Sequence, residues 1–286
     1  FVLIVASCSD ANKSTDFEVS LHDKPLLEVQ IQPRPLPNPN KNAYYGDLHV
    51  HTENSFDAYT FGTISTPADA YKYAQGYPIL HPSGYLIQLS KPLDFYAVTD
   101  HGIFMGLMKE AADTTSKFSQ YEFTKPLHNL NESAGMGFFS LIKRQGLFKP
   151  FGEEVRAGLE DGSIDLSLIL EVGRTVWQKT IKAADDAYVP GTFTTFAAYE
   201  YTPSLDLYNN YLHRNVIFKD TKNLPAQLFT RNNSQDPEDL WDWMNQLRSN
   251  GVESLAIPTN TNTTEGAAFS INDQHGGQID EEVEHN

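Results

Sequence analysis

Two histidines one residue apart begin the part of the chain whose residue types could do chemistry. His49 and His51 stand in the run Gly46–Thr52, inside a segment, residues 44–52, that we expect to form a strand. Residues two apart in a strand point to one face, so both imidazoles could approach one metal ion. With nine histidines in 286 residues, such a pair also arises by chance, and the alternative is two half-exposed strand histidines.

Further histidines and carboxylates follow at the ends of other expected strands. Asp100 and His101 end one apolar segment, Glu200 ends another, and His213 begins a third. In α/β folds the chemistry lies at the carboxyl ends of the strands. A carboxylate there is costly to bury unless it is paired or bound to metal, and a salt bridge is the alternative for Glu200. Mixed imidazole and carboxylate ligands suit zinc, manganese or iron.

The elements that must position these residues indicate an α/β domain. Strands are expected at 44–52, 93–101, 193–202, 212–218 and 255–260, and helices at 67–74, 166–187 and 237–250. Strands that alternate with helices favour a largely parallel sheet or a barrel. The region 109–163 is rich in Phe, Gly and charged residues, and we expect it to be an irregular insertion over the site.

The net charge limits the partners of the chain. A formal charge of -16 with a pI near 4.9 repels phosphate backbones, so nucleic acid is not expected as a ligand. An anionic small-molecule substrate would need a local positive centre, which bound metal ions could supply. The sequence also has no run of eighteen apolar residues, so it contains no complete transmembrane helix.

The first 42 residues are expected to precede the folded domain. Residues 1–24 resemble the end of a signal peptide, with a lipobox at Val5-Ala6-Ser7-Cys8 and a polar tether after it. Residues 25–42 are rich in proline and favour an extended linker. Cys8 is then a lipidation site, and the chain a bacterial lipoprotein, periplasmic or anchored to the outer membrane by its lipid alone. The alternative for Cys8 is a free cysteine at the end of a buried edge strand.

The candidate ligands, in this order, resemble the PHP superfamily (polymerase and histidinol phosphatase) of metal-dependent hydrolases. A closer resemblance is to a large bacterial family of unknown function, number 3604. It is carried by the runs Gly46–Thr52, Ser55–Gly62, Pro92–His101, Leu212–Phe218 and Pro237–Trp241. The resemblance implies that residues 43–286 are the N-terminal portion of a PHP-like domain, a partial distorted β/α barrel truncated at the C-terminus.

The resemblance also implies two or three divalent metal ions at the strand ends. Their ligands would be His49, His51, Asp100, His101, Glu200 and His213, with Glu200 bridging two ions. The chain departs from the family at Thr259, where a histidine should follow Pro258, and a hydroxyl is a far weaker ligand. A final Asp-x-His is also expected: Asp273 and His275 have the spacing but stand in a turn-like context, and the alternatives are a pair beyond Asn286 or an incomplete site.

The function expected is hydrolysis of a small anionic substrate by a metal-activated water, and the resemblance to the superfamily implies that this substrate is a phosphoester. Arg214 is expected as a catalytic residue that contacts the phosphate, and its alternative is a salt bridge. A second hypothesis is an amidohydrolase-like reaction on a carbon centre at the same metal site. A third is a non-catalytic surface lipoprotein that binds a ligand with a decayed site, which Thr259 favours.

Overall fold

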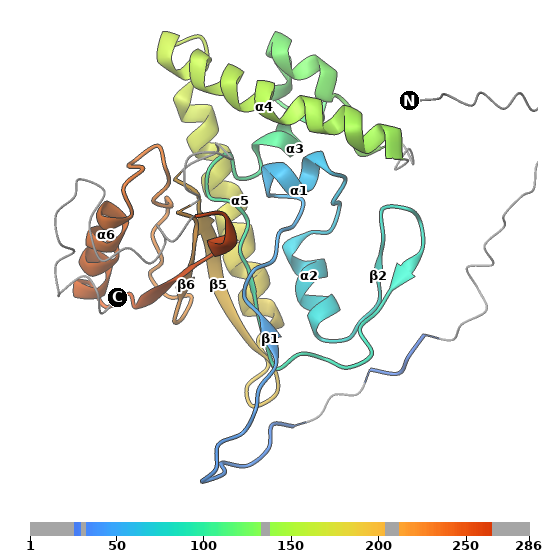
Figure 1. Cartoon of the computed structure of the whole chain (residues 1–286), viewed down its shortest axis with the longest axis vertical. Helices are drawn as coiled ribbons and strands as arrows, with labels where there is room; N and C mark the ends of the chain where they lie inside the picture. The colour runs from blue at the N-terminus through green and yellow to red at the C-terminus, as the bar shows by residue number, and fades with distance from the viewer. Residues whose placement is uncertain (1–25, 30–32, 133–137, 204–211, 265–286) are drawn as a thin grey trace, which may run out of the picture.

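A curled, five-stranded half-barrel sheet organises the fold, with its strands in the order β1-β4-β5-β6-β7 (Figure 1). The structure is a computed structural model that describes residues 26–29, 33–132, 138–203 and 212–264. The strands are β1 (Gly46–Asp47), β4 (Phe95–Val98), β5 (Thr194–Tyr201), β6 (Arg214–Phe218) and β7 (Ser254–Pro258). Cys8, Asp273 and His275 lie outside the described residues.

The sheet is parallel in one half only. β1, β4 and β5 run parallel, whereas β6 is antiparallel to β5 and β7 is antiparallel to β6. The expectation of a largely parallel sheet is therefore wrong for β6 and β7. The alternation of residues along a strand reports which face is buried, but it carries no information on the direction of the neighbouring strand. A mixed α/β fold is confirmed.

Three expected helices are present at nearly the expected bounds. These are α2 (Pro67–Ala74), α5 (Leu166–Ala187) and α6 (Pro237–Ser249). A capping box between Thr66 and Asp69 begins α2, and the Asp236 side chain accepts from Glu238 N at the start of α6. Besides these, α1 (Phe56–Thr60) is a short helix, and β2 (Ile79–Leu80) and β3 (Leu86–Ile87) form a separate antiparallel pair.

The region 109–163 is mostly helical, so the expectation of an irregular insertion is wrong. It holds most of α3 (Leu107–Ala112), the 3-10 helices η1 (Phe118–Gln120) and η2 (Glu122–Leu127), and α4 (Phe138–Asp161). Pro150 lies inside α4 and obscures the helical pattern in the sequence. Phe151 and Val155 bury α4 in the same core as α1 and α3, and this packing outweighs the low local preference.

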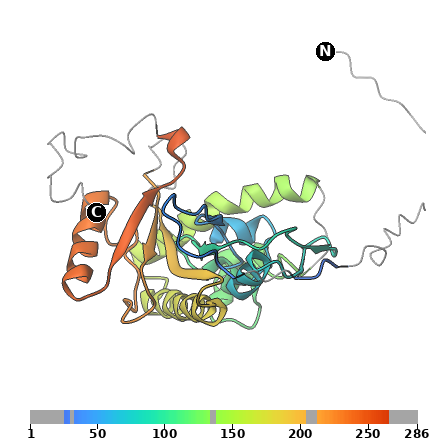
Figure 2. The same ribbon diagram turned by 90° about the horizontal axis from the view of Figure 1, so that it is seen from below.

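Helices cover the convex face of the sheet. Tyr199, Val216 and Phe218 pack with Trp177 of α5 and Leu240 of α6. Figure 2 shows α5 along one side of the sheet and α6 near its β7 edge. The concave face carries a smaller cluster of Ala97, Ala198 and Ile217, with Leu48 and Phe196 packed against it. Among the described residues, the helices are all too short or too polar to cross a membrane.

Candidate metal centre

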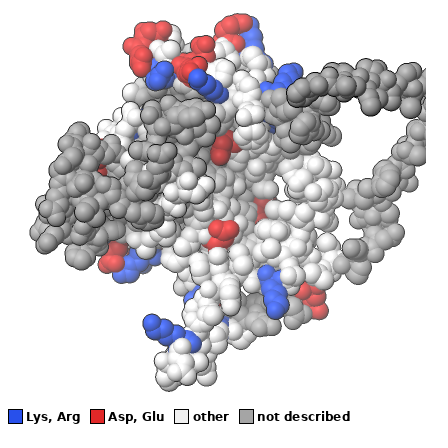
Figure 3. Space-filling view, viewed as in Figure 1, with Lys and Arg blue, Asp and Glu red and all other residues white. Residues whose placement is uncertain are grey.

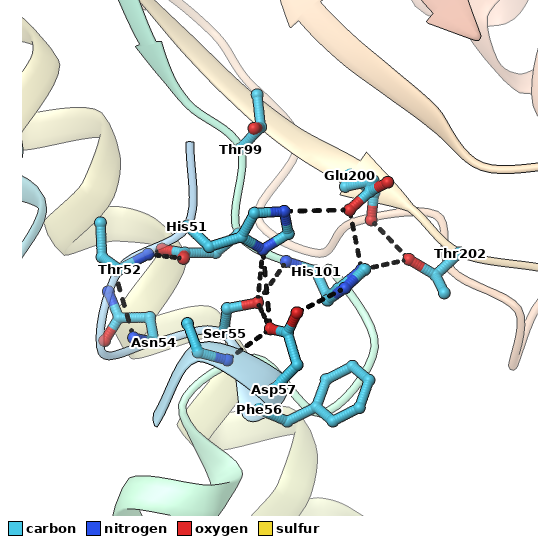
Figure 4. A network of polar contacts seen from close by, with 12 residues as sticks. His51, Thr52, Asn54, Ser55, Phe56, Asp57, Thr99, His101, Glu200 and Thr202 are labelled. Carbon is cyan, nitrogen blue, oxygen red and sulfur yellow. Dashed lines mark hydrogen bonds and ion pairs between the residues drawn. The ribbon is translucent and has the colours of Figure 1, made fainter. Parts of the chain in front are cut away.

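Four histidines and two carboxylates converge where β4 and β5 end. Figure 4 shows four of them close together, on the loop after β1, on α1, after β4 and on β5. Three groups could each hold an ion, with ligand atoms all within 4.8 Å of one another. The groups are His49, His51 and Glu200; His51, Asp57 and His101; and His101, Glu200 and His213. The groups share residues, so together they form one centre.

Glu200 lies in the middle of this centre and is fully buried. Its Oε2 atom is 3.0 Å from His101 Nδ1, 3.3 Å from His51 Nε2 and 3.7 Å from His49 Nε2. Its Oε1 atom lies 3.2 Å from His213 Nδ1. One carboxylate therefore faces four imidazoles that arrive from three separate segments of the chain.

The sheet places the two central side chains next to each other. His101 and Glu200 form a parallel bridge just beyond the end of β4, and Glu200 N donates to Asp100 O over 2.9 Å. Ala198 and Glu200 share the concave face, because residues two apart along a strand do so. The site thus lies on the same face of the sheet as the cluster of Ala97, Ala198 and Ile217.

The loop that carries His49 and His51 is held by side chains of the neighbouring strands. The expected strand 44–52 is a strand only at β1. Beyond it, Val50 N donates to Thr99 Oγ1 over 2.8 Å, and Asn215 Nδ2 donates to Leu48 O over 2.7 Å. These contacts keep the loop against β4 and β6 and point both imidazoles toward Glu200.

Asp57 joins the centre from the first turn of α1 and was not among the residues expected from the sequence. Its carboxylate lies 3.5 Å from His101 Nε2 and 3.7 Å from His51 Nδ1. Ser55 Oγ donates to Asp57 Oδ1 over 2.6 Å and lies 2.8 Å from His51 Nδ1. The only sequence signal for Asp57 is the run Ser55–Gly62 that carries part of the family resemblance.

Burial and neighbouring charges shift the pKa values of these groups in opposite directions. Burial opposes a charge on His101, yet Glu200 and then Asp57 raise the pKa of His101 to about 10. Burial lowers the pKa of His51 to about 4, so this imidazole is neutral near pH 7. Burial would raise the pKa of Glu200, but His101 and the other histidines hold it well below its ordinary value. Glu200 is therefore ionised, as a metal ligand must be.

Asp100 lies next to the centre but outside the three groups of potential ligands. Thr52 N and Thr52 Oγ1 donate to its two carboxylate oxygens over 2.5 and 2.6 Å. Burial raises the pKa of Asp100 to about 7, against these hydrogen bonds. Alternation explains the placement, because consecutive residues at a strand end point to opposite sides and His101 takes the inner one. Its role as a ligand stays a prediction.

The alternation of side chains along β6 also places Arg214 away from the centre. Asn215 pairs with Glu200 and Arg214 pairs with Tyr201, so Arg214 shares the convex face with Tyr201. Its Nη1 donates to Leu212 O over 2.7 Å, and its guanidinium lies 5.4 Å from the centre of the Trp241 ring. The contact of Arg214 with a phosphate stays a prediction.

Thr259, which stands where the family resemblance leads us to expect a histidine, is part of the centre. Thr259 Oγ1 donates to Glu200 Oε1 over 2.7 Å. The next residue, Asn260, has its Nδ2 3.3 Å from His213 Nδ1. This position therefore contributes a hydroxyl donor to Glu200 in place of an imidazole.

The residues of the centre fit a divalent metal ion. Glu200 Oε2 is buried and makes no hydrogen bond with the residues that the structure describes, although three imidazole nitrogens face it. A buried carboxylate oxygen that accepts no hydrogen bond is costly, and a cation shared with those imidazoles would satisfy it. Imidazole and carboxylate ligands together suit zinc, manganese or iron.

Comparison with known proteins supports the closer of the two resemblances. The model of the family described as "Protein of unknown function (DUF3604)" matches residues 38–286. A search of the curated proteins gives no match, and a search of the solved structures gives none. Membership of the PHP superfamily stays a prediction. The match covers nearly the whole chain that follows the N-terminal segment, and the chain therefore belongs to the DUF3604 family.

Proposed function

We propose that this chain is a metal-dependent hydrolase that cleaves a phosphoester. The observation that carries the proposal is the buried, ionised Glu200, whose Oε2 faces His49, His51 and His101 at 3.0 to 3.7 Å. Such a cluster is expensive to maintain for stability alone, because each buried polar group must be compensated. The resemblance to the PHP superfamily supports hydrolysis as the reaction class.

The residues of the centre have distinct roles in this proposal. His49, His51, Asp57, His101, Glu200 and His213 would hold the ions. Divalent ions there would act as Lewis acids, favouring a nucleophilic water near neutral pH and offsetting the charge of a phosphate. Ser55 and Thr202 orient the histidines: Ser55 Oγ lies 2.8 Å from His51 Nδ1, and Thr202 Oγ1 lies 2.6 Å from His101 Nδ1.

A substrate would reach the centre from the side of His49. The His49 side chain is 37% exposed, while that of Glu200 is 0% exposed. The chain carries a formal charge of -16, and the basic side chains on the face shown in Figure 3 do not gather into one patch. An anionic substrate would therefore be bound by the local charge of the metal centre and not by a basic surface.

The experiment is a paired assay of the purified full chain after loading with zinc or manganese. Release of phosphate from 4-nitrophenyl phosphate is expected for the wild type and should be lost in Glu200→Gln. Cleavage of 4-nitrophenyl acetate without phosphate release would instead support hydrolysis at a carbon centre. Stoichiometric metal without turnover of either ester would overturn the enzyme proposal and favour a ligand-binding protein.

The N-terminal segment supports a proposal on location. We propose that Cys8, preceded by Val5-Ala6-Ser7, is lipidated and holds the chain at a bacterial membrane through the lipid alone. Mass spectrometry of the protein expressed in a bacterial host should find the lipid mass on wild type and not on Cys8→Ser. An unmodified Cys8 in the membrane fraction would contradict the proposal.

A further inference from the structure

The two oxygens of the Glu200 carboxylate have different surroundings. Oε1 accepts from Thr259 Oγ1 over 2.7 Å and lies 3.2 Å from His213 Nδ1. Oε2 makes no hydrogen bond with the described residues and faces His101, His51 and His49. The carboxylate is thus held at one oxygen, and the other is presented to imidazoles.

The strand ladder fixes the Thr259 hydroxyl in place. Thr259 N donates to His213 O over 2.9 Å, which continues the pairing of Pro258 with Arg214 between β7 and β6. Thr259 is 8% exposed, and its β-branched side chain has few rotamers available. The pairing of β7 with β6 and the restricted rotamers therefore hold the Thr259 hydroxyl in one position beside Oε1.

We propose that Thr259 is a positioning residue for the metal centre: its hydroxyl holds Glu200 Oε1 so that Oε2 is aimed at His49, His51 and His101. The inference rests on the proposed metal site. A hydrogen bond to one carboxylate oxygen fixes the rotamer of the side chain and thereby the direction in which the other oxygen points. Partners of this kind commonly change metal affinity by about 10- to 100-fold when they are removed.

The test compares two substitutions in the full chain by calorimetric titration with Zn²⁺ alone. Thr259→Ser keeps the hydroxyl, and Thr259→Val keeps the shape without it. We expect the dissociation constant of Thr259→Ser to stay within about threefold of wild type, and that of Thr259→Val to rise about 10- to 100-fold. Thr180→Val is the matched control, because Thr180 is also buried and its Oγ1 donates only to Val176 O in α5.

Two further readouts separate positioning from folding. The thermal midpoint of each metal-free variant reports stability, and the absorption spectrum with Co²⁺ in place of Zn²⁺ should change in Thr259→Val only. If wild type and Thr259→Val bind Zn²⁺ equally, or if Thr259→Ser loses as much affinity as Thr259→Val, the inference on Thr259 fails while the metal site stands. If wild type binds neither Zn²⁺ nor, in the same titration, Mn²⁺, the proposed function fails and the inference fails with it.

Discussion

His101 and Glu200 are joined both through their backbones and through their side chains. They form a parallel bridge where β4 and β5 end, and Gly102 N donates to Glu200 O over 2.9 Å. Beyond the bridge, His101 Nδ1 lies 3.0 Å from Glu200 Oε2. Because the sheet fixes both Cα atoms, the spacing between imidazole and carboxylate is set by the fold, as a preorganised site requires.

Removing the first two histidines should lower the metal content of the chain. In His49→Ala/His51→Ala, the group of His49, His51 and Glu200 loses both imidazoles and the group of His51, Asp57 and His101 loses one, while the group of His101, Glu200 and His213 stays intact. Elemental analysis after dialysis should therefore find less metal per chain than in wild type. The matched control is His81→Ala/His128→Ala, which removes two imidazoles that belong to none of the three groups and should leave metal content unchanged. Equal metal content in the two double variants would show that any bound ion lies elsewhere.

Metal should stabilise the fold, because an ion that binds only the native state shifts the unfolding equilibrium. Free ion at about 100 times its dissociation constant adds about 2.7 kcal/mol to the free energy of unfolding, which corresponds to roughly 5 to 10 °C in thermal midpoint for a chain of this size. Calorimetric scans with excess chelator and with added zinc or manganese measure the difference. Glu200→Gln should show little shift with metal, and a shift as large as that of wild type would argue against Glu200 as a ligand.

Gly46 should tolerate no side chain, because it lies directly against β4. A Cβ atom at Gly46 would stand 2.2 Å from Phe95 O, so Gly46→Ala must move β1 and the loop that carries His49. We expect a loss of about 1 to 3 kcal/mol in the free energy of unfolding, together with weaker metal binding. Gly173→Ala in α5 is the control, since nothing lies within 4 Å of its Cβ position. Gly173→Ala should stabilise by about 0.5 to 1 kcal/mol, and equal midpoints for both variants in urea would contradict the steric argument.

The sequence predicts the site best where a residue that can bind metal ends an apolar strand. His101 and Glu200 could be predicted because each ends an apolar strand. Asp57 could not, since it reaches the centre through the packing of α1 against α3 and α4, which no local pattern reports. Phe148 of α4 stacks on Phe56, with the two ring centroids 4.9 Å apart. The ring centroids of Phe56 and His101 are 5.0 Å apart. Long-range packing therefore completes a site whose first residues are readable from strand ends alone.

The surroundings of Arg214 favour a structural role over the predicted contact with a phosphate. Its guanidinium is 5.4 Å from the Trp241 ring centre and donates to Leu212 O, and burial lowers its pKa to about 10. The arginine remains charged near neutral pH, so its stacking on Trp241 and its charged hydrogen bond both stabilise the native state. Arg214→Met should cost roughly 2 to 3 kcal/mol of unfolding free energy.

Arg214→Lys separates the positive charge of the side chain from the planar shape of the guanidinium. It keeps the charge and loses the planar group that lies over Trp241, so it should destabilise the fold almost as much as Arg214→Met. Urea unfolding gives the stability of each variant, and steady-state kinetics with 4-nitrophenyl phosphate give KM and kcat. A structural role predicts lower stability with KM close to that of wild type. A rise of about tenfold or more in KM at unchanged stability would instead assign Arg214 to the substrate phosphate. Because Arg214 lies on the Tyr201 face of β6, such a contact would require that face to open toward the centre.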